Sequence, residues 1–444
     1  MNYIPHTKEE VKEMLKTIGV HSVEDLFSDI NEELRAKSFN LPKGKSEFEV
    51  KEYLEKLSQK NNLSLISFLG GGFYDHYIPA VVDALVSRSE FYTAYTPYQS
   101  ECSQGTLQTI YEYQTAICAL TDMEVANASL YDGGTSLFEG LMMAYRIKGR
   151  NKFIIDGSLN PIYQKMLFTY TENLPFEIVR TPYHIGQVER EKIYQNLDEE
   201  TAAVILQNPN FFGTIDDYTD IVEHAHSVGA LVIISVYPIS LGLIKTPGEM
   251  GADIVTGEGQ SLGIPLSFGG PYLGFLACKE EFVRKMPGRI VGATVDKEGK
   301  RGFVLTLQVR EQHIRRQKAT SNICTNSALC ALRALIFLSV LGKNGFIELS
   351  KLNYDKSEFA KRVLKEISGI DVLNTPTFNE FTIRLPMDAN EIVKKMTKKG
   401  FVPGLPLGKF FKDMKNYLLI TVTEKRKKEE ILKFAEELNN AINL

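Results

Sequence analysis

The sequence predicts an α/β fold with a helical N-terminal arm, a large domain built on a mostly parallel sheet, and a small C-terminal α+β domain. Three observations support this prediction. Short apolar runs alternate with helical stretches from about residue 150. One strand, helix and strand follow each other closely enough to imply a parallel pair. Near residue 345 the pattern of apolar residues changes, and it then predicts long helices that alternate with single strands.

The arm is predicted over residues 1–65. Thr7 and Glu10 have the spacing of a capping box, apolar residues follow at helical intervals, and Gly19 ends the helix. Apolar stripes over 23–30 and 50–57 indicate further helical segments. So short a segment cannot bury a core of its own, so we expect it to pack on another surface.

The large domain is predicted over residues 66–340. Its strands are expected at 153–155, 176–179, 202–206, 230–234, 252–255 and 273–277. The helix expected over 216–228 has one apolar face and stops at Gly229, which makes a βαβ unit with its flanking strands.

The small domain is predicted over residues 341–444. Its helices are expected at 346–368, 389–399 and 427–442, and its strands at 381–385 and 417–422.

Composition excludes several classes of protein. Of the 444 residues, 43% are hydrophobic and 24% charged, and the net charge of −4 gives no reason to expect nucleic acid as a partner. The first residues lack the apolar core of a signal peptide, and no run of about 18 apolar residues suggests a membrane span. We therefore expect a cytoplasmic protein.

A metal site is not expected. The five cysteines are scattered and never form a CxxC pair, which also argues against a disulfide framework. His224 and His226 are two residues apart on a predicted helix and so point to different faces.

Several motifs together carry a specific resemblance: FLGGGFYDHYIP at 68–79, FYTAYTPYQSECSQGTLQ at 91–108, YDGGTSLFEG at 131–140 and ATSNICTN at 319–326. In order and spacing they resemble the N-terminal half, or alpha subunit, of the glycine decarboxylase (P-protein) family of the glycine cleavage system. The resemblance covers most of the chain. It implies the layout of fold-type I enzymes that use pyridoxal phosphate (PLP).

The resemblance assigns a phosphate loop to Gly133, Gly134, Thr135 and Ser136, small residues ahead of a helix. A tight turn without a ligand is the alternative. Where the type I pattern has an Asp for the pyridine nitrogen this chain has Ser235, and where it has the Schiff-base lysine this chain has Gln260. Asn160 corresponds to the residue that stacks on the ring. Because Gln cannot form an imine, the chain is not expected to hold PLP covalently.

In related dimers of the cysteine-desulfurase branch, the threonine that binds the phosphate of the partner's PLP comes shortly after an arginine, and Thr320 comes shortly after Arg315 and Arg316. The resemblance therefore implies a phosphate contact made in trans. The alternative is that residues 313–318 form a solvated, charged helix end.

The segment 91–108 is rich in hydroxyl and amide groups and poor in aliphatic side chains, which makes it an unfavourable core segment. It is better suited to recognising small polar groups. The candidates for a shared active site are Thr93, Tyr95, Tyr98, Glu101, Ser103 and Gln104. A tyrosine-rich subunit interface without a chemical role is the alternative.

The function implied by the resemblance is glycine decarboxylation by an alpha2beta2 heterotetramer. The beta chain, glycine dehydrogenase subunit 2, would hold the PLP lysine, and the aminomethyl group would pass to the lipoyl arm of H-protein. Two alternatives remain open. A self-sufficient PLP enzyme is opposed by Gln260, and a scaffold or regulatory subunit with a degenerate pocket would have no direct role in the active site.

Overall fold

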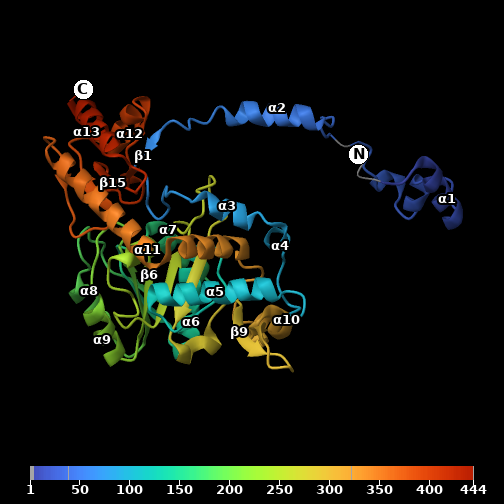
Figure 1. Cartoon of the computed structure of the whole chain (residues 1–444), viewed down its shortest axis with the longest axis horizontal. Helices are drawn as coiled ribbons and strands as arrows, with labels where there is room; N and C mark the ends of the chain where they lie inside the picture. The colour runs from blue at the N-terminus through green and yellow to red at the C-terminus, as the bar shows by residue number, and fades with distance from the viewer. Residues whose placement is uncertain (1–4, 39, 322, 444) are drawn as a thin grey trace. The chain divides into compact units, whose positions relative to one another are not determined.

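The computed structural model describes residues 5–38, 40–321 and 323–443. The chain forms two compact units, Met1–Leu63 and Ser64–Leu444 (Figure 1). The first contains α1 (Lys8–Ile18), α2 (Glu47–Ser58) and the 3-10 turns η1 (Glu24–Phe27) and η2 (Glu32–Leu34). Capping boxes at Thr7 and Ser46 start the two helices.

The helix predicted over 23–30 is wrong in length. Only the turn η1 forms there, and the carboxylate of Asp25 accepts hydrogen bonds from the backbone N–H groups of His21 and Ser22, both at 2.8 Å. Such local side-chain bonds stabilise turns in competition with a continuous helix.

A seven-stranded sheet forms the centre of the second unit, in the order β2-β8-β7-β6-β5-β3-β4. The strands are β2 (Val125–Ala126), β3 (Lys152–Ile155), β4 (Glu177–Arg180), β5 (Thr201–Asn208), β6 (Leu231–Val236), β7 (Ile254–Glu258) and β8 (Gly274–Cys278). The strands from β7 to β4 are parallel, and β8 runs antiparallel to both β7 and β2. Every residue of β6 and β7 is buried, which explains why β6 is apolar except for Ser235 and why β7 begins with Ile254 and Val255.

Helices cover the sheet: α5 (Gln104–Thr121), α6 (Gly133–Lys148), α7 (Pro161–Thr171), α8 (Arg190–Tyr194) and α9 (Thr219–Ser227). α6 packs on β7 and β8, while α5 packs on α11 (Ala328–Lys365) (Figure 1). The short helices α3 (Ala80–Val86) and α10 (Gln312–Arg315) lie in the segments between the predicted motifs, and α4 (Ser89–Tyr92) runs into the start of the motif 91–108.

Two features of this unit differ from the sequence prediction. Residues after β8 form an unpredicted antiparallel hairpin, β9 (Ile290–Val295) with β10 (Arg301–Thr306), which packs on α5. The helix expected over 346–368 begins earlier, as α11, and is broken at Gly342, where φ is 60° and ψ is −178°. By length and hydropathy α11 could span a membrane. Its buried residues Cys330 and Phe337 instead belong to the main hydrophobic core.

The C-terminal part has its own antiparallel sheet, in the order β11-β12-β15-β14, and its own core cluster. Its elements are β11 (Asp371–Val372), β12 (Glu380–Arg384), α12 (Ala389–Lys398), β13 (Phe401–Val402), β14 (Leu405–Pro406), β15 (Tyr417–Thr421) and α13 (Lys428–Asn443). β1 (Ile66–Ser67) pairs in parallel with β13 in a separate two-stranded sheet, so the chain enters the glycine-rich motif 68–79 directly from this pair of strands.

Candidate active site

The residues that occupy the predicted cofactor positions lie at the carboxyl ends of the parallel strands, where open α/β sheets bind their ligands. Ser235 is the penultimate residue of β6, and Asn160 caps the N-terminus of α7. Together with Glu258 they line a pocket of about 30 Å³. Pockets for small molecules and cofactors usually measure roughly 300–1,000 Å³, so this space is too small for PLP.

Gln260 follows the end of β7 and is buried. Its Oε1 accepts a hydrogen bond from the backbone N–H of Tyr74 at 2.8 Å. Its Nε2 donates to the carbonyl oxygens of Tyr74, at 3.0 Å, and Ile264, at 2.8 Å. The side chain of Gln260, predicted to stand at the lysine position, therefore holds the glycine-rich motif 68–79 in place.

Glu380 on β12 fills the space beside Tyr74 from the C-terminal sheet. Its carboxylate accepts hydrogen bonds from the backbone N–H of Gly71 at 2.6 Å, the Tyr74 hydroxyl at 2.7 Å and the Thr421 hydroxyl at 2.7 Å. Burial raises the pKa of Glu380 above its ordinary value. Gly71 has a φ of +89°, a conformation that glycine adopts without strain.

A second buried network adjoins the first. His76 Nδ1 lies 2.7 Å from Glu424 Oε2, and His76 Nε2 contacts the Tyr237 hydroxyl. Burial alone would raise the pKa of Glu424, but hydrogen bonds from His76 and from the Tyr77 N–H hold it at about 2. Protein side chains thus occupy the space around the cofactor position.

The predicted phosphate loop starts α6, but donors of Gly133, Thr135 and Ser136 are used within the chain. The Gly133 N–H donates to Glu258 Oε2 at 2.9 Å. The Thr135 N–H donates to Asp132 Oδ1 at 2.8 Å, and the Ser136 hydroxyl donates to the Asp132 carbonyl oxygen at 2.8 Å. Two acidic side chains therefore stand where a phosphate dianion would bind. With Gln260 and the small cavity, this arrangement does not fit PLP.

The segment 91–108 and the motif 319–326 meet in space; Asn322 of that motif lies outside the described residues. Both line a pocket of about 90 Å³, and the Tyr95 hydroxyl lies 3.1 Å from Thr325 Oγ1. Arg289 Nη2 donates to the Tyr98 hydroxyl at 2.9 Å, and its guanidinium lies over the Tyr98 ring. Tyr95 is 74% exposed, so a partner could reach it.

The other candidates of this segment have different surroundings. The Thr93 hydroxyl donates to the Ser89 carbonyl oxygen at 2.7 Å at the end of α4. The Gln104 amide accepts from the Phe303 N–H at 2.8 Å and donates to the Phe303 carbonyl oxygen at 2.9 Å, which joins α5 to β10. Glu101 is exposed, and Ser103 is half-buried at the start of α5.

Thr320 is half-buried and follows the charged segment 313–318. Its N–H donates to the Arg310 carbonyl oxygen at 3.0 Å. The Arg310 guanidinium in turn donates to the carbonyl oxygens of Leu307 at 3.1 Å and Gly288 at 3.0 Å. The backbone at Thr320 is therefore held independently of its hydroxyl group.

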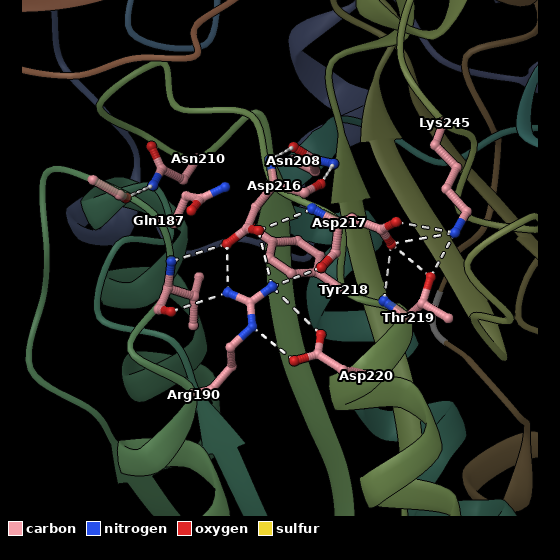
Figure 2. Close-up of polar contacts among 12 residues, drawn as sticks. Gln187, Arg190, Asn208, Asn210, Asp216, Asp217, Tyr218, Thr219, Asp220 and Lys245 are labelled. Carbon is pink, nitrogen blue, oxygen red and sulfur yellow. Dashed lines mark hydrogen bonds and ion pairs between the residues drawn. The ribbon is translucent and has the colours of Figure 1, made fainter.

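The loops after β4 and β5 are fixed by a guanidinium clamp (Figure 2). Arg190 Nη1 and Nη2 donate to the two oxygens of Asp216 at 3.0 and 2.9 Å, and its Nε donates to Asp220 at 2.7 Å. Lys245 forms a separate, exposed ion pair with Asp217 at 3.1 Å. The clamp joins the start of α8 to the start of α9.

Sequence reasoning missed Glu258, Glu380 and Arg289, all of which are buried. For Glu258 a signal was present, because an ionisable residue between two glycines at the end of an apolar strand needs a specific partner. Glu380 and Arg289 carry no comparable local signal.

Comparison with known sequences gives a consistent result. Residues 1–438 match the family described as "Glycine cleavage system P-protein". A protein of Geotalea uraniireducens (strain Rf4), "Probable glycine dehydrogenase (decarboxylating) subunit 1", is 58% identical over 443 residues, covering 100% of both chains. A relative of the same name from Maridesulfovibrio salexigens is 54% identical over the same length, again covering 100% of both chains.

Comparison with solved structures agrees. A crystal structure of glycine decarboxylase (P-protein) of the glycine cleavage system, in inhibitor-bound form, superposes with a TM-score of 0.92 and 42% identity, covering 99% of this chain and 100% of that one. A sphingosine-1-phosphate lyase of Burkholderia pseudomallei, with a TM-score of 0.67 and 16% identity over 93% of each chain, shares the fold alone. The fold prediction is thus confirmed, and the chain belongs to the glycine cleavage system P-protein family.

Proposed function

We propose that this chain is the non-lysine-bearing subunit of a two-subunit glycine decarboxylase. The relatives that match it from end to end are named as subunit 1 of that enzyme. The observation that supports the proposal is that Gln260, which the resemblance aligns with the Schiff-base lysine, is fully engaged with Tyr74 and Ile264. A chain without an imine-forming lysine needs a partner that has one.

The cofactor of the complex is proposed to be PLP, held covalently by the second subunit in an alpha2beta2 assembly. When bound, PLP supplies an electron sink for the loss of CO2 from glycine. The remaining aminomethyl group is proposed to pass to the lipoyl arm of H-protein. We propose a cytoplasmic location for the complex, which cell fractionation would check.

This chain is proposed to complete the partner's active site. Tyr95 and Tyr98 are proposed to face the partner, which the exposure of Tyr95 and the hydrogen bond from Arg289 to the Tyr98 hydroxyl support. Thr320 is proposed to donate its hydroxyl hydrogen to the phosphate of the partner's PLP. Thr93, Glu101, Ser103 and Gln104 would shape the same surface.

Reconstitution tests the proposal. The purified chain should be colourless and should not exchange labelled bicarbonate into the carboxyl group of glycine. Addition of the lysine-bearing chain should produce both PLP absorbance and exchange. Exchange by this chain alone would overturn the proposal.

A scaffold without a role at the site is the second candidate. It predicts that Tyr95→Ala and Thr320→Ala leave the kcat and KM of the reconstituted complex unchanged. Under our proposal, at least one of the two kinetic constants changes severalfold while the assembly persists in size-exclusion chromatography.

A further inference from the structure

The carboxyl group of Glu258 lies at the start of α6 and binds a backbone N–H group there. Glu258 Oε2 accepts from the Gly133 N–H at 2.9 Å. Its Oε1 accepts from the N–H of Gln260 at 2.9 Å and from that of Leu273 at 3.2 Å. A single side chain thus binds three backbone donors from three segments of the chain.

The fit around this carboxyl group is close. Glu258 is only 7% exposed. A Cβ atom at Gly133 would lie 2.9 Å from Glu258 Cβ and 2.5 Å from the Tyr163 hydroxyl oxygen, so only glycine is accommodated there. In a phosphate loop, a glycine leaves room for the cofactor. Here the room that Gly133 leaves is occupied by Glu258.

We propose that the Glu258 carboxyl group takes the place of a bound phosphate as the hydrogen-bond acceptor of these three N–H groups, so that the anion site at the start of α6 is retained but closed by this side chain. The proposal concerns the isolated chain and does not depend on which reaction the assembled enzyme catalyses. The ligand that the opened site would bind is a phosphate or another tetrahedral oxyanion.

Removal of the side chain should open the site. The truncation in Glu258→Ala would leave the N–H groups of Gly133, Gln260 and Leu273 without their acceptor. Glu258 also lines the existing cavity of about 30 Å³, so the truncation enlarges that cavity beside the exposed donors. Asp132 would still repel an anion, so the double variant Asp132→Asn/Glu258→Ala should bind more tightly than the single variant.

The experiment uses the full-length chain and inorganic phosphate. Calorimetry at constant ionic strength should give a dissociation constant on the order of 1–10 mM for Glu258→Ala, and no saturation for the wild type in the same range. Phosphate at ten times this constant should raise the Tm of the variant by about 1–2 °C. The Tm shift serves as a readout even if the variant is less stable.

Two further variants test the location. Gly133→Ala/Glu258→Ala should lose phosphate binding, because the new Cβ lies where the anion would approach. Glu380→Ala, which removes another buried carboxyl group with several donors, should gain none. Circular dichroism confirms that each variant is folded.

The proposal is overturned if folded Glu258→Ala binds no phosphate, or if binding survives the added Gly133→Ala change. Should Glu258→Ala not fold, Glu258→Ser retains a hydroxyl acceptor for part of the network and takes its place. A folded Glu258→Ser without a phosphate-dependent Tm shift likewise overturns the proposal.

Discussion

Gln260 and Tyr74 form a reciprocal pair: Gln260 Oε1 accepts from the Tyr74 N–H at 2.8 Å, and Gln260 Nε2 donates to the Tyr74 carbonyl oxygen at 3.0 Å. The two residues are 186 positions apart in the sequence. Because the Gln260 side chain satisfies both backbone polar groups of buried Tyr74, it has a structural role whatever residue the family has at this position.

We predict that Gln260→Lys does not create an active enzyme from this chain. Lysine offers no acceptor to the Tyr74 N–H, and a buried donor without a partner costs about 1–3 kcal/mol of unfolding free energy. Ser235 still provides no carboxylate for a pyridine nitrogen. Urea denaturation and bicarbonate exchange measure the two effects. A variant as stable as the wild type that decarboxylates glycine alone would contradict this account.

We predict that stability falls as the pH rises from about 5 to about 8. Burial raises the pKa of Glu258 from 4.5 to about 8 and that of Asp156 from 3.8 to about 7. At a pH between a group's pKa in the unfolded state and its higher pKa in the folded state, the native protein binds more protons than the unfolded chain. The contribution of that group to the free energy of unfolding is therefore complete below the unfolded-state pKa. It is lost as the pH rises through the folded-state pKa. Each group contributes on the order of a few kcal/mol.

Urea denaturation at several pH values measures how the free energy of unfolding changes with pH. Glu258→Gln and Asp156→Asn remove one titration each, so each should flatten the profile in part. A wild-type profile that rises between pH 5 and pH 8, or one that neither variant changes, would contradict the assignment.

We predict that Arg190→Lys lowers stability by roughly 2–4 kcal/mol. Lysine cannot reproduce the paired bonds to Asp216, whose carboxylate is buried, and the bond to Asp220 at the same time. Lys245→Ala is the matched control, because it removes an exposed ion pair and should cost less than about 1 kcal/mol. Equal losses in the two variants would show that the clamp has no special role.

The sequence was most informative where a strand is buried on both faces. β3 and β5 to β8 each appear as a short apolar run, and their boundaries were predicted to within a few residues, as were those of the partly exposed strand β4. The hairpin of β9 and β10 was missed because its outer end is exposed and lacks such a run. The first half of α11 was missed because a helix packed between other elements has no simple polar face.

For the site, spacing from the strand ends located Ser235 and Gln260 at the carboxyl edge of the sheet. It could not reveal what these positions contact. The bond between Gly133 and Glu258 joins residues 125 positions apart, and the bond between Tyr74 and Glu380 joins residues 306 apart. Such pairs follow from the tertiary fold, and local patterns do not encode them.

We predict that Thr320→Ala weakens PLP retention in the reconstituted complex. If the Thr320 hydroxyl donates to the cofactor phosphate, its loss removes a hydrogen bond to a charged group, which contributes about 1.5–3 kcal/mol and corresponds to a rise of roughly tenfold or more in the PLP dissociation constant. The fold should be unaffected, because the Thr320 N–H bond to Arg310 and the bonds of Arg310 to Leu307 do not involve the hydroxyl group.

Thr320→Ser is the matched control, since it keeps the hydroxyl group and should retain PLP almost as well as the wild type. The measurement is the loss of PLP absorbance after dilution of each complex, with size-exclusion chromatography to confirm that the assembly persists. If Thr320→Ala and Thr320→Ser both retain PLP like the wild type, the phosphate contact lies elsewhere. If both lose it equally, the methyl-bearing side chain acts through packing, because serine preserves the hydrogen bond and lacks only that methyl group.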